Sequence, residues 1–244
     1  MLNSSGSLQA RGKRALFVSE IPVLDHGFVR LDGSLADDLS VVNSARVSFA
    51  NRHETMEEGD DKLLWFLMKN KHGTPFEHNI FRFHVKAPIF VFREWQRHRI
   101  SSYNEWSARY AQLEPEFYVP EQKQVRSQVG KPGAYKFEGI LDGLKAQRFR
   151  DQLHMQSNAA YFQYQKYIDE GIAKEQARLF LPVNIYSQMY WTVNARSLMN
   201  FLSLRNSEHA MWEIREYAQV VETIFSDLMP VTAEAFIKND RVSP

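Results

Sequence analysis

Apolar positions along the chain repeat at two spacings, and the longer spacing predicts helices. Residues 60–71 begin with two acids, continue with an apolar stripe at residues 63–68 and end with lysines, the charge order that a helix dipole favours. Residues 144–169 carry apolar and aromatic side chains at helical spacing and are followed by Gly171. The pattern therefore predicts two helices, the second of them long.

The shorter spacing predicts strands. Phe81, Phe83 and Val85 alternate with polar residues, and Pro88 follows, which is typical of a strand with one buried face. We also expect strands at 28–31 and 185–193, helices at 34–45, 89–96, 174–180, 195–204 and 209–228, extended segments at 46–49 and 109–118, and a loop at 121–135. The predicted fold class is α+β. We expect a small antiparallel sheet flanked by long helices, in one domain at residues 15–244 after a flexible tail at residues 1–14.

Composition narrows the classes of protein. The 244 residues are 44% hydrophobic, enough for a sizeable core, and the net charge of +1 argues against the broad basic face of a general nucleic-acid or membrane-surface binder. No run of eighteen apolar residues occurs, so we expect a cytoplasmic protein. With no cysteine, thiolate metal sites and thiol nucleophiles are excluded. Neither a dinucleotide-binding glycine turn nor a P-loop is present, so arginines must hold any bound phosphate.

A metal site is not expected. The eight histidines form no set with metal-ligand spacing. The acidic stretch at residues 57–61 is the one candidate for a metal-dependent nucleotide hydrolase, and it is more plausible as the acidic start of the following helix.

Residues 97–110 hold the densest group of hydrogen-bonding side chains. Arg97, Arg99 and Arg109 offer planar donors for phosphate or carboxylate, Ser107 is a small donor and acceptor, and Glu105 is the single acid. A solvated helix would mix Glu and Lys at helical spacing instead. These residues leave two readings open, an anionic-ligand site and an interface or surface segment.

A second polar patch lies in the predicted helix at 195–204 and just beyond it. At about 100° per residue, Arg196 and Asn200 fall on one side, while Asn194 and Arg205 fall roughly opposite. Arginines on two opposed faces indicate two ligands or a subunit interface. The alternative is a surface helix whose arginines pair with acids.

These motifs together resemble one family. One motif is Arg97-His98-Arg99 followed, after seven residues, by Ser107. It is similar to the signature of the flavin-dependent thymidylate synthases, also called the thymidylate synthase complementing proteins. The resemblance continues through His72 to His78, the segment 191–202, and Arg205 with His209, and it covers residues 24–238.

The resemblance implies a function and an assembly. Members convert dUMP to dTMP, taking the carbon from 5,10-methylenetetrahydrofolate and reducing equivalents from NADPH through FAD. They are homotetramers whose active sites are built by several chains. The implied partners are therefore dUMP, NADPH, the folate and further copies of the chain, with no nucleic acid and no membrane.

The resemblance also implies roles for individual residues. The FAD site would take Ser48, Thr74, Arg97, His98, Arg99, Ile100, Asn194, Arg196 and Asn200, with Glu105 from another subunit, and His72 would lie near the flavin and folate. The dUMP site would take Glu94, Trp95, Gln96, Arg97, Glu105, Trp106, Ser107, Ala108, Arg109, Arg178 and Arg205. Glu94 departs from the family, which often has Gln there. A carboxylate near the nucleotide phosphate would repel it unless Arg93 or Arg97 neutralises the charge.

The chemistry of the implied reaction agrees with the composition. Since the chain has no cysteine, no enzyme thiolate can add to the uracil ring, so activation must be electrostatic. Arg205 would be the catalytic group, a fixed cation for negative charge that develops when N3 of the pyrimidine is deprotonated. Two other classes stay open, a nucleotide-binding regulatory module without catalysis and the metal-dependent hydrolase.

Overall fold

A computed structural model describes residues 19–132 and 134–244 of the chain. The predicted tail at residues 1–14 lies outside the described residues. The strands are β1 (Ile21–Val23), β2 (Gly27–Leu35), β3 (Ile80–Pro88), β4 (Ser102–Glu105), β5 (Arg126–Val129), β6 (Lys136–Gly139) and β7 (Tyr186–Asn194). The helices are α1 (Asp38–Arg46), α2 (Asp60–Lys69), α3 (Thr74–Glu77), α4 (Ile89–Trp95), α5 (Gly143–Asp169), α6 (Lys174–Ala177), α7 (Ala195–Arg205), α8 (Trp212–Leu228) and α9 (Pro230–Lys238). Three short 3-10 helices are η1 (Val47–Phe49), η2 (Gln122–Gln124) and η3 (Arg178–Phe180).

Five of the strands form one antiparallel sheet in the order β1-β2-β3-β7-β4. The predicted alternation is confirmed, because Phe81, Phe83 and Val85 of β3 are fully buried while Arg82 is exposed. The polar side chains of β3 lie on the opposite face, as in an antiparallel sheet with one solvated face. The α+β class with a small antiparallel sheet is therefore correct.

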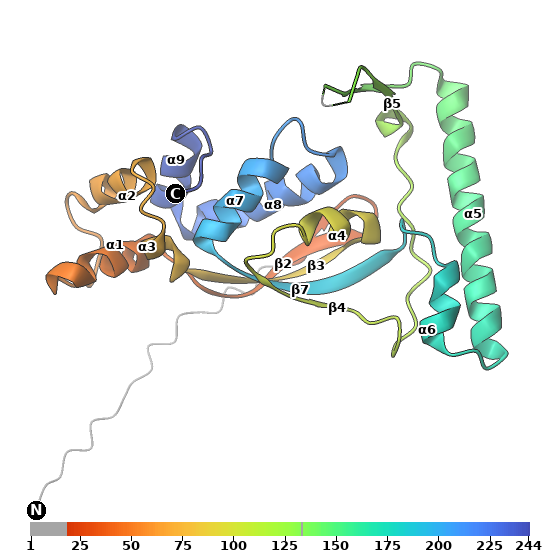
Figure 1. Cartoon of the computed structure of the whole chain (residues 1–244), viewed down its shortest axis with the longest axis horizontal. Coiled ribbons are helices and arrows are strands. Elements are labelled where there is room, and N and C mark those ends of the chain that lie inside the picture. The colour runs from red at the N-terminus through yellow and green to blue at the C-terminus, as the bar shows by residue number, and fades with distance from the viewer. Residues whose placement is uncertain (1–18, 133) are drawn as a thin grey trace, which may run out of the picture.

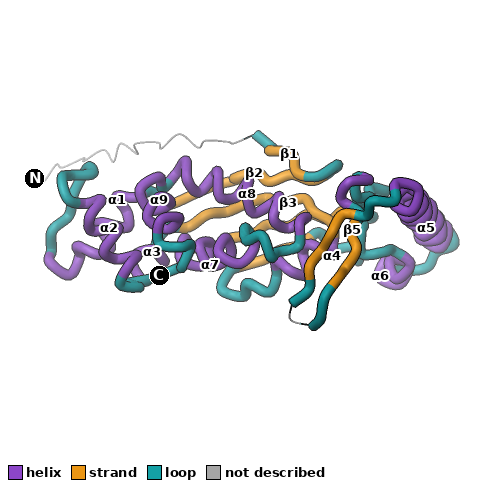
Figure 2. Tube along the Cα trace, turned by 90° about the horizontal axis from the view of Figure 1, so that it is seen from above, coloured by secondary structure: helices purple, strands orange, loops and turns teal. Residues whose placement is uncertain are grey.

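In the described part of the chain, helices cover one face of this sheet and leave the other uncovered (Figure 1). The core contains the buried faces of α7 and α8 together with Trp95 of α4. The long helix α5 does not flank the sheet. It stands at one end of the molecule, as the view from above also shows (Figure 2), and packs through Tyr161 against a small second core around Phe117 and Ile185. No helix of the described residues has the length and apolar character needed to cross a membrane.

Two predicted boundaries near the start of the chain are wrong. Ser34 stays in β2 because it pairs with Phe81 of β3, and the helix begins only at Asp38, where the Asp37 side chain accepts the backbone N–H of Ser40 at 2.7 Å. Residues 46–49, predicted as extended, end α1 and continue as η1. Pairing with β3 and capping by Asp37 thus outweigh the local pattern.

Three later predictions also need correction. Residues 107–110 form a turn, in which Tyr110 N–H donates to Ser107 O at 3.0 Å, so only the end of the segment 109–118 is extended, where Phe117 bridges Ile185. Residues 121–135 are not a plain loop, because they contain η2 and β5, and β5 pairs with β6 as a hairpin. The helix expected from residue 209 begins at Trp212.

Candidate functional site

A strongly cationic cavity lies between α7 and the segment that follows α4. We call it the arginine pocket. It encloses about 560 Å³ and is lined by Glu77, Arg97, His98, Arg99, Ile100, Ser101, Val193, Arg196, Ser197, Asn200, Leu204, Arg205, Ser243 and Pro244. Four guanidinium groups and one carboxylate make it a site for an anion. The structure thus brings together six of the residues assigned to FAD by resemblance, which are Arg97, His98, Arg99, Ile100, Arg196 and Asn200.

The elements that form the pocket explain why these residues meet. The helix α4 ends at Trp95, and β4 then returns along β7, so the Arg-His-Arg motif lies in the turn between them. The strand β7 leads directly into α7, whose first turn carries Arg196. The N-terminus of this helix is capped by Asn194, whose side chain accepts Ser197 N–H at 2.8 Å. Asn194, assigned to FAD, is therefore a helix cap and does not line the pocket.

Arg205 is held by three acceptors. Its Nη1 donates to Glu94 Oε2 at 3.0 Å, its Nη2 to the Glu94 carbonyl oxygen at 3.1 Å, and its Nε to His98 Nε2 at 3.0 Å. A guanidinium has five N–H groups, so two have no partner among the described residues and can donate to a ligand. The partner that neutralises Glu94 is thus Arg205, whereas the sequence suggested Arg93 or Arg97.

The predicted separation of the two arginine faces of α7 is only partly correct. Arg196, Asn200 and Arg205 all line the arginine pocket. Arg205 is the last residue of α7, and its long side chain turns toward Glu94 and His98, so it also lines the larger cavity described below. A single cation therefore separates two cavities.

His98 is a neutral acceptor in this arrangement. Burial, together with the positive charge of Arg205, lowers the pKa of His98 from 6.5 to about 4. The unprotonated Nε2 can then accept from Arg205, and the ring packs edge-on against Phe201 with centroids 5.0 Å apart. Protonation of His98 would remove this acceptor.

Arg196 connects the arginine pocket to a shallower one. Its Nη1 lies 2.6 Å from Glu77 Oε1, and its side chain passes over Gly73, where an added Cβ would come within 2.5 Å of Arg196 Nε. The shallower pocket encloses about 450 Å³, and its lining includes Ser48, His72, Thr74 and Arg196. Two further FAD candidates, Ser48 and Thr74, thus lie beside His72 in a pocket that shares Arg196 with the arginine pocket.

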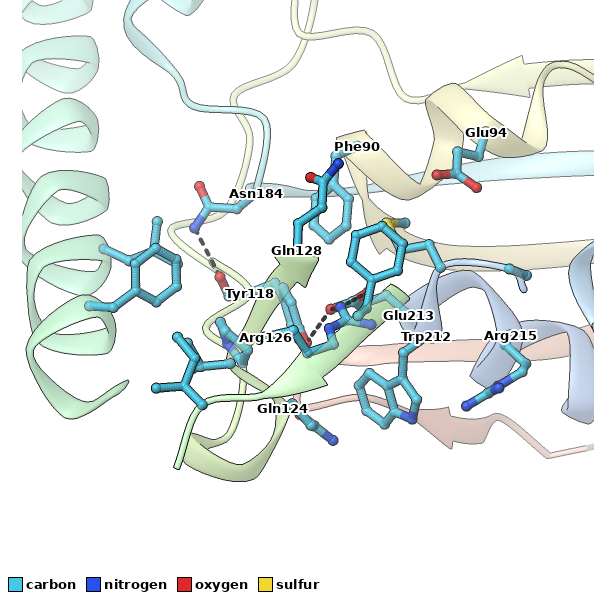
Figure 3. Close-up of a pocket in the computed structure, with 18 of the residues that line it drawn as sticks. Phe90, Glu94, Tyr118, Gln124, Arg126, Gln128, Asn184, Trp212, Glu213 and Arg215 are labelled. Atoms are coloured by element: carbon cyan, nitrogen blue, oxygen red, sulfur yellow. Dashed lines mark hydrogen bonds and ion pairs between the residues drawn. The ribbon is translucent and has the colours of Figure 1, made fainter. Parts of the chain in front are cut away.

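A larger cavity lies under the β5–β6 hairpin and encloses about 1100 Å³ (Figure 3). Of the dUMP candidates, Glu94 and Arg205 line it. Its opposite wall is fixed by Glu213 of α8, which accepts Arg126 Nη2 at 2.7 and 2.8 Å and the Tyr118 hydroxyl at 3.1 Å. Burial, together with the negative charge of Glu213, raises the pKa of Tyr118, so this hydroxyl keeps its proton and donates.

The other dUMP candidates lie elsewhere in the chain. Arg109 Nε contacts Glu175 Oε2 at 3.0 Å, Arg178 Nε donates to the Glu175 carbonyl oxygen at 3.2 Å, and both arginines are exposed near the start of α6. Ser107 lies in the turn that precedes Arg109. Within one chain these three residues do not line the large cavity or the arginine pocket.

Two dUMP candidates belong to the hydrophobic core instead. Trp95 is fully buried and packs on Trp191 and Phe201, and Ala108 lies in the second core. The Trp95 side chain therefore has no accessible surface to offer a nucleotide in one chain, and its assignment to dUMP stays a prediction. Trp106 packs against the same second core as Ala108. Gln96 Nε2 donates to Glu105 Oε2 at 3.2 Å on the surface, so Glu105 also lies outside both cavities.

The acidic stretch has a structural role. Asp60 is fully buried and accepts from Arg46 Nη2 at 2.7 Å and from the backbone N–H of Glu57 at 2.9 Å, and His53 Nδ1 lies 2.9 Å away. These bonds use both carboxylate oxygens. In the described part of the chain, no group of three or more His, Asp or Glu side chains is arranged to hold a metal ion.

Sequence reasoning missed several residues of the site. Glu77, Ser243 and Pro244 line the arginine pocket, and Trp212 and Glu213 line the large cavity. For Glu77 the sequence offered one signal, because the arginines of the site need an acidic partner. The C-terminal residues carried none, because only the packing of α9 brings them to α7.

Comparisons with known proteins agree with this geometry. Residues 31–231 match a family model described as thymidylate synthase complementing protein. A flavin-dependent thymidylate synthase of Thermosipho melanesiensis is 47% identical over 219 residues, covering 90% of this chain and 94% of the relative. That of Tropheryma whipplei strain TW08/27 is 46% identical over 242 residues, covering 94% and 97%. The crystal structure of a UMP/dUMP methylase, PolB from Streptomyces cacaoi bound with 5-Br dUMP, superposes with a TM-score of 0.80 at 43% identity, covering 92% and 100%.

Proposed function

Because the chain belongs to the family of thymidylate synthase complementing proteins, we propose that it is a flavin-dependent thymidylate synthase that converts dUMP to dTMP. We propose 5,10-methylenetetrahydrofolate as the carbon donor, NADPH as the reductant and FAD as the flavin. The observation that carries the proposal is Arg205, a single clamped guanidinium that separates an arginine-lined pocket from a larger cavity. Such a junction suits a nucleotide on one side and a flavin on the other.

The residues of the arginine pocket fit FAD. Arg97, Arg99 and Arg196 supply cations for its diphosphate, and Gly73 leaves room for the Arg196 side chain between this pocket and the one with His72 and Thr74. When bound, FAD supplies the redox chemistry of the reaction. The chain's own residues bind and orient the flavin and the nucleotide, and they exclude water.

Arg205 is the proposed catalytic residue. Its two unbound N–H groups would donate to the pyrimidine and stabilise negative charge that develops when N3 loses its proton. His98 and Glu94 hold the planar guanidinium in one orientation, so little reorganisation is needed as charge develops. This activation needs no enzyme thiolate, and the chain has no cysteine.

We propose that each nucleotide site is shared between subunits of a homotetramer. Ser107, Arg109 and Arg178 form the phosphate part of the proposed dUMP site, yet they lie apart from Glu94 and Arg205 in one chain. Another copy can supply them, together with Glu105. Exposed apolar side chains support such contacts, among them Leu144 of α5 and Leu179 of η3, which are 72% and 81% exposed.

The experiment that tests the proposal combines spectra with activity. We expect the purified protein to bind FAD and to form dTMP from dUMP with the folate donor and NADPH. Arg205→Ala should lower turnover by about 100- to 1000-fold while retaining FAD, as loss of one charge-stabilising donor does in other enzymes. Arg196→Ala should weaken FAD and leave dUMP binding intact. Equal flavin retention in the two variants would contradict these roles, and a protein with no affinity for FAD would instead be a regulatory module or a hydrolase.

A further inference from the structure

The segment after α9, residues 239–244, returns to the proposed flavin site. Asp240 and Arg241 have φ angles of 53° and 56°, a left-handed conformation that non-glycine residues rarely adopt. The turn is closed by Arg241 N–H donating to Phe236 O and Val242 N–H donating to Asn239 O, both at 3.0 Å. The segment is therefore directed away from α9, toward α7.

One end of this segment is anchored beside Arg205. Arg241 Nη1 lies 2.7 Å from Glu222 Oε1 and 2.9 Å from Glu222 Oε2 of α8. The same carboxylate accepts from Nδ2 of Asn206, the residue that follows Arg205 and ends α7. Because Glu222 is buried, this pairing fixes the turn to both helices.

The other end is anchored on Arg196. Ser243 Oγ donates to the Arg196 carbonyl oxygen at 2.9 Å, and Arg196 Nε donates to the Pro244 carbonyl oxygen at 2.7 Å. Pro244 is buried, and both residues line the arginine pocket. The segment thus contributes a wall to the pocket and an acceptor to one of its cations.

The contacts of Arg196 show what this acceptor does. An acidic partner of Arg196 is Glu77, and the two side chains are 45% and 40% exposed, so this pair alone holds the guanidinium weakly. The bond from Nε to Pro244 fixes the inner end of the guanidinium, and within residues 19–132 and 134–244 its Nη2 has no hydrogen bond. An arginine ordered in advance loses less freedom when it binds an anion.

We propose that residues 239–244 form part of the flavin pocket and that Ser243 and Pro244 are positioning residues, which hold Arg196 ready for the phosphates of the flavin. The inference rests on the proposed function. It adds the C-terminal segment to a site that the family resemblance placed in other parts of the chain.

The test measures the FAD dissociation constant by titrating apoprotein and following flavin fluorescence. Removal of Ser243 and Pro244 should raise this constant about three- to tenfold, the loss expected when one side chain must be ordered on binding. Ser243→Ala should raise it less. Val242→Ala is the matched control, because this exposed side chain lies in the same segment and does not line the pocket. Melting temperatures confirm that each variant folds.

A double-mutant cycle separates positioning from a general structural effect. In an Arg196→Ala background, removal of the two residues should change FAD affinity no further, because their effect acts through Arg196. An unchanged or tighter constant after removal in the wild-type background, or an equal loss in the Arg196→Ala background, would overturn the inference. FAD binding by the wild-type protein is a separate measurement, and its absence would instead refute the proposed function.

Discussion

Glu94 and Arg205 form an ion pair in which Nη1 and Oε2 are 3.0 Å apart and the Glu94 carbonyl oxygen accepts a second bond. The pair joins α4 to the end of α7 at the boundary of two cavities. Its side chains are 34% and 20% exposed, so it is partly shielded from solvent. Glu94 therefore positions the proposed catalytic cation.

This relationship predicts different effects of two substitutions at Glu94. Glu94→Ala removes a charge-assisted bond worth roughly 1.5–3 kcal/mol, so kcat/KM for dUMP should fall about 10- to 100-fold. Glu94→Gln retains an acceptor for Arg205 and should cost less than about fivefold. Steady-state kinetics on both variants checks this. An equal loss in the two would mean that charge, rather than position, is what Glu94 contributes.

Gly73→Ala should weaken FAD binding without unfolding the protein. The added Cβ would lie 2.5 Å from Arg196 Nε, so the flexible guanidinium must move away from the pocket. We expect the FAD dissociation constant to rise about tenfold, the loss of roughly one charge-assisted bond. Gly33→Ala is the control, because its Cβ would approach Arg82 Nη2 only to 3.4 Å. The same loss in both variants would contradict a specific role for Gly73.

Stability should depend on pH through His98. Its folded pKa of about 4 lies below the ordinary 6.5, so unfolding takes up a proton between these values. The contribution of this neutral histidine is fully present above about pH 6.5 and is lost as pH falls toward 4. Urea unfolding at pH 7 and pH 5 should show that His98→Gln, which cannot titrate, gains stability relative to wild type at the lower pH. A difference that stays constant with pH would refute this.

The free energy of unfolding should depend on Arg126 of the β5–β6 hairpin. Glu213 is 4% exposed and pairs with Arg126, whose side chain is 27% exposed. Arg126→Ala leaves a buried carboxylate with one donor, Tyr118, and should lower the free energy of unfolding by about 2–3 kcal/mol, somewhat less than the loss of a fully buried partner. Lys123→Ala, which breaks an exposed pair with Glu121, should cost less than about 1 kcal/mol. Chemical denaturation of both variants measures the contrast.

Local patterns were sufficient for the elements with strong periodicity. The helices predicted at 60–71 and 144–169 correspond closely to α2 and α5, and the alternation at Phe81, Phe83 and Val85 predicted the buried face of β3. Short edge elements such as β1 and β4 were missed. Their residues become strands by pairing with β2 and β7, and a partner distant in sequence leaves no local pattern.

The same division holds for the site. Residue type and spacing alone were enough to name the candidate residues, because the Arg-His-Arg motif, the arginines of α7 and the missing cysteine can all be read from the chain. They could not determine that Arg205 pairs with Glu94, that Asn194 caps a helix, or that Trp95 is core. Each of these depends on which of several possible partners a side chain meets. Only the packing of α4, α7 and the C-terminal segment around one sheet decides that.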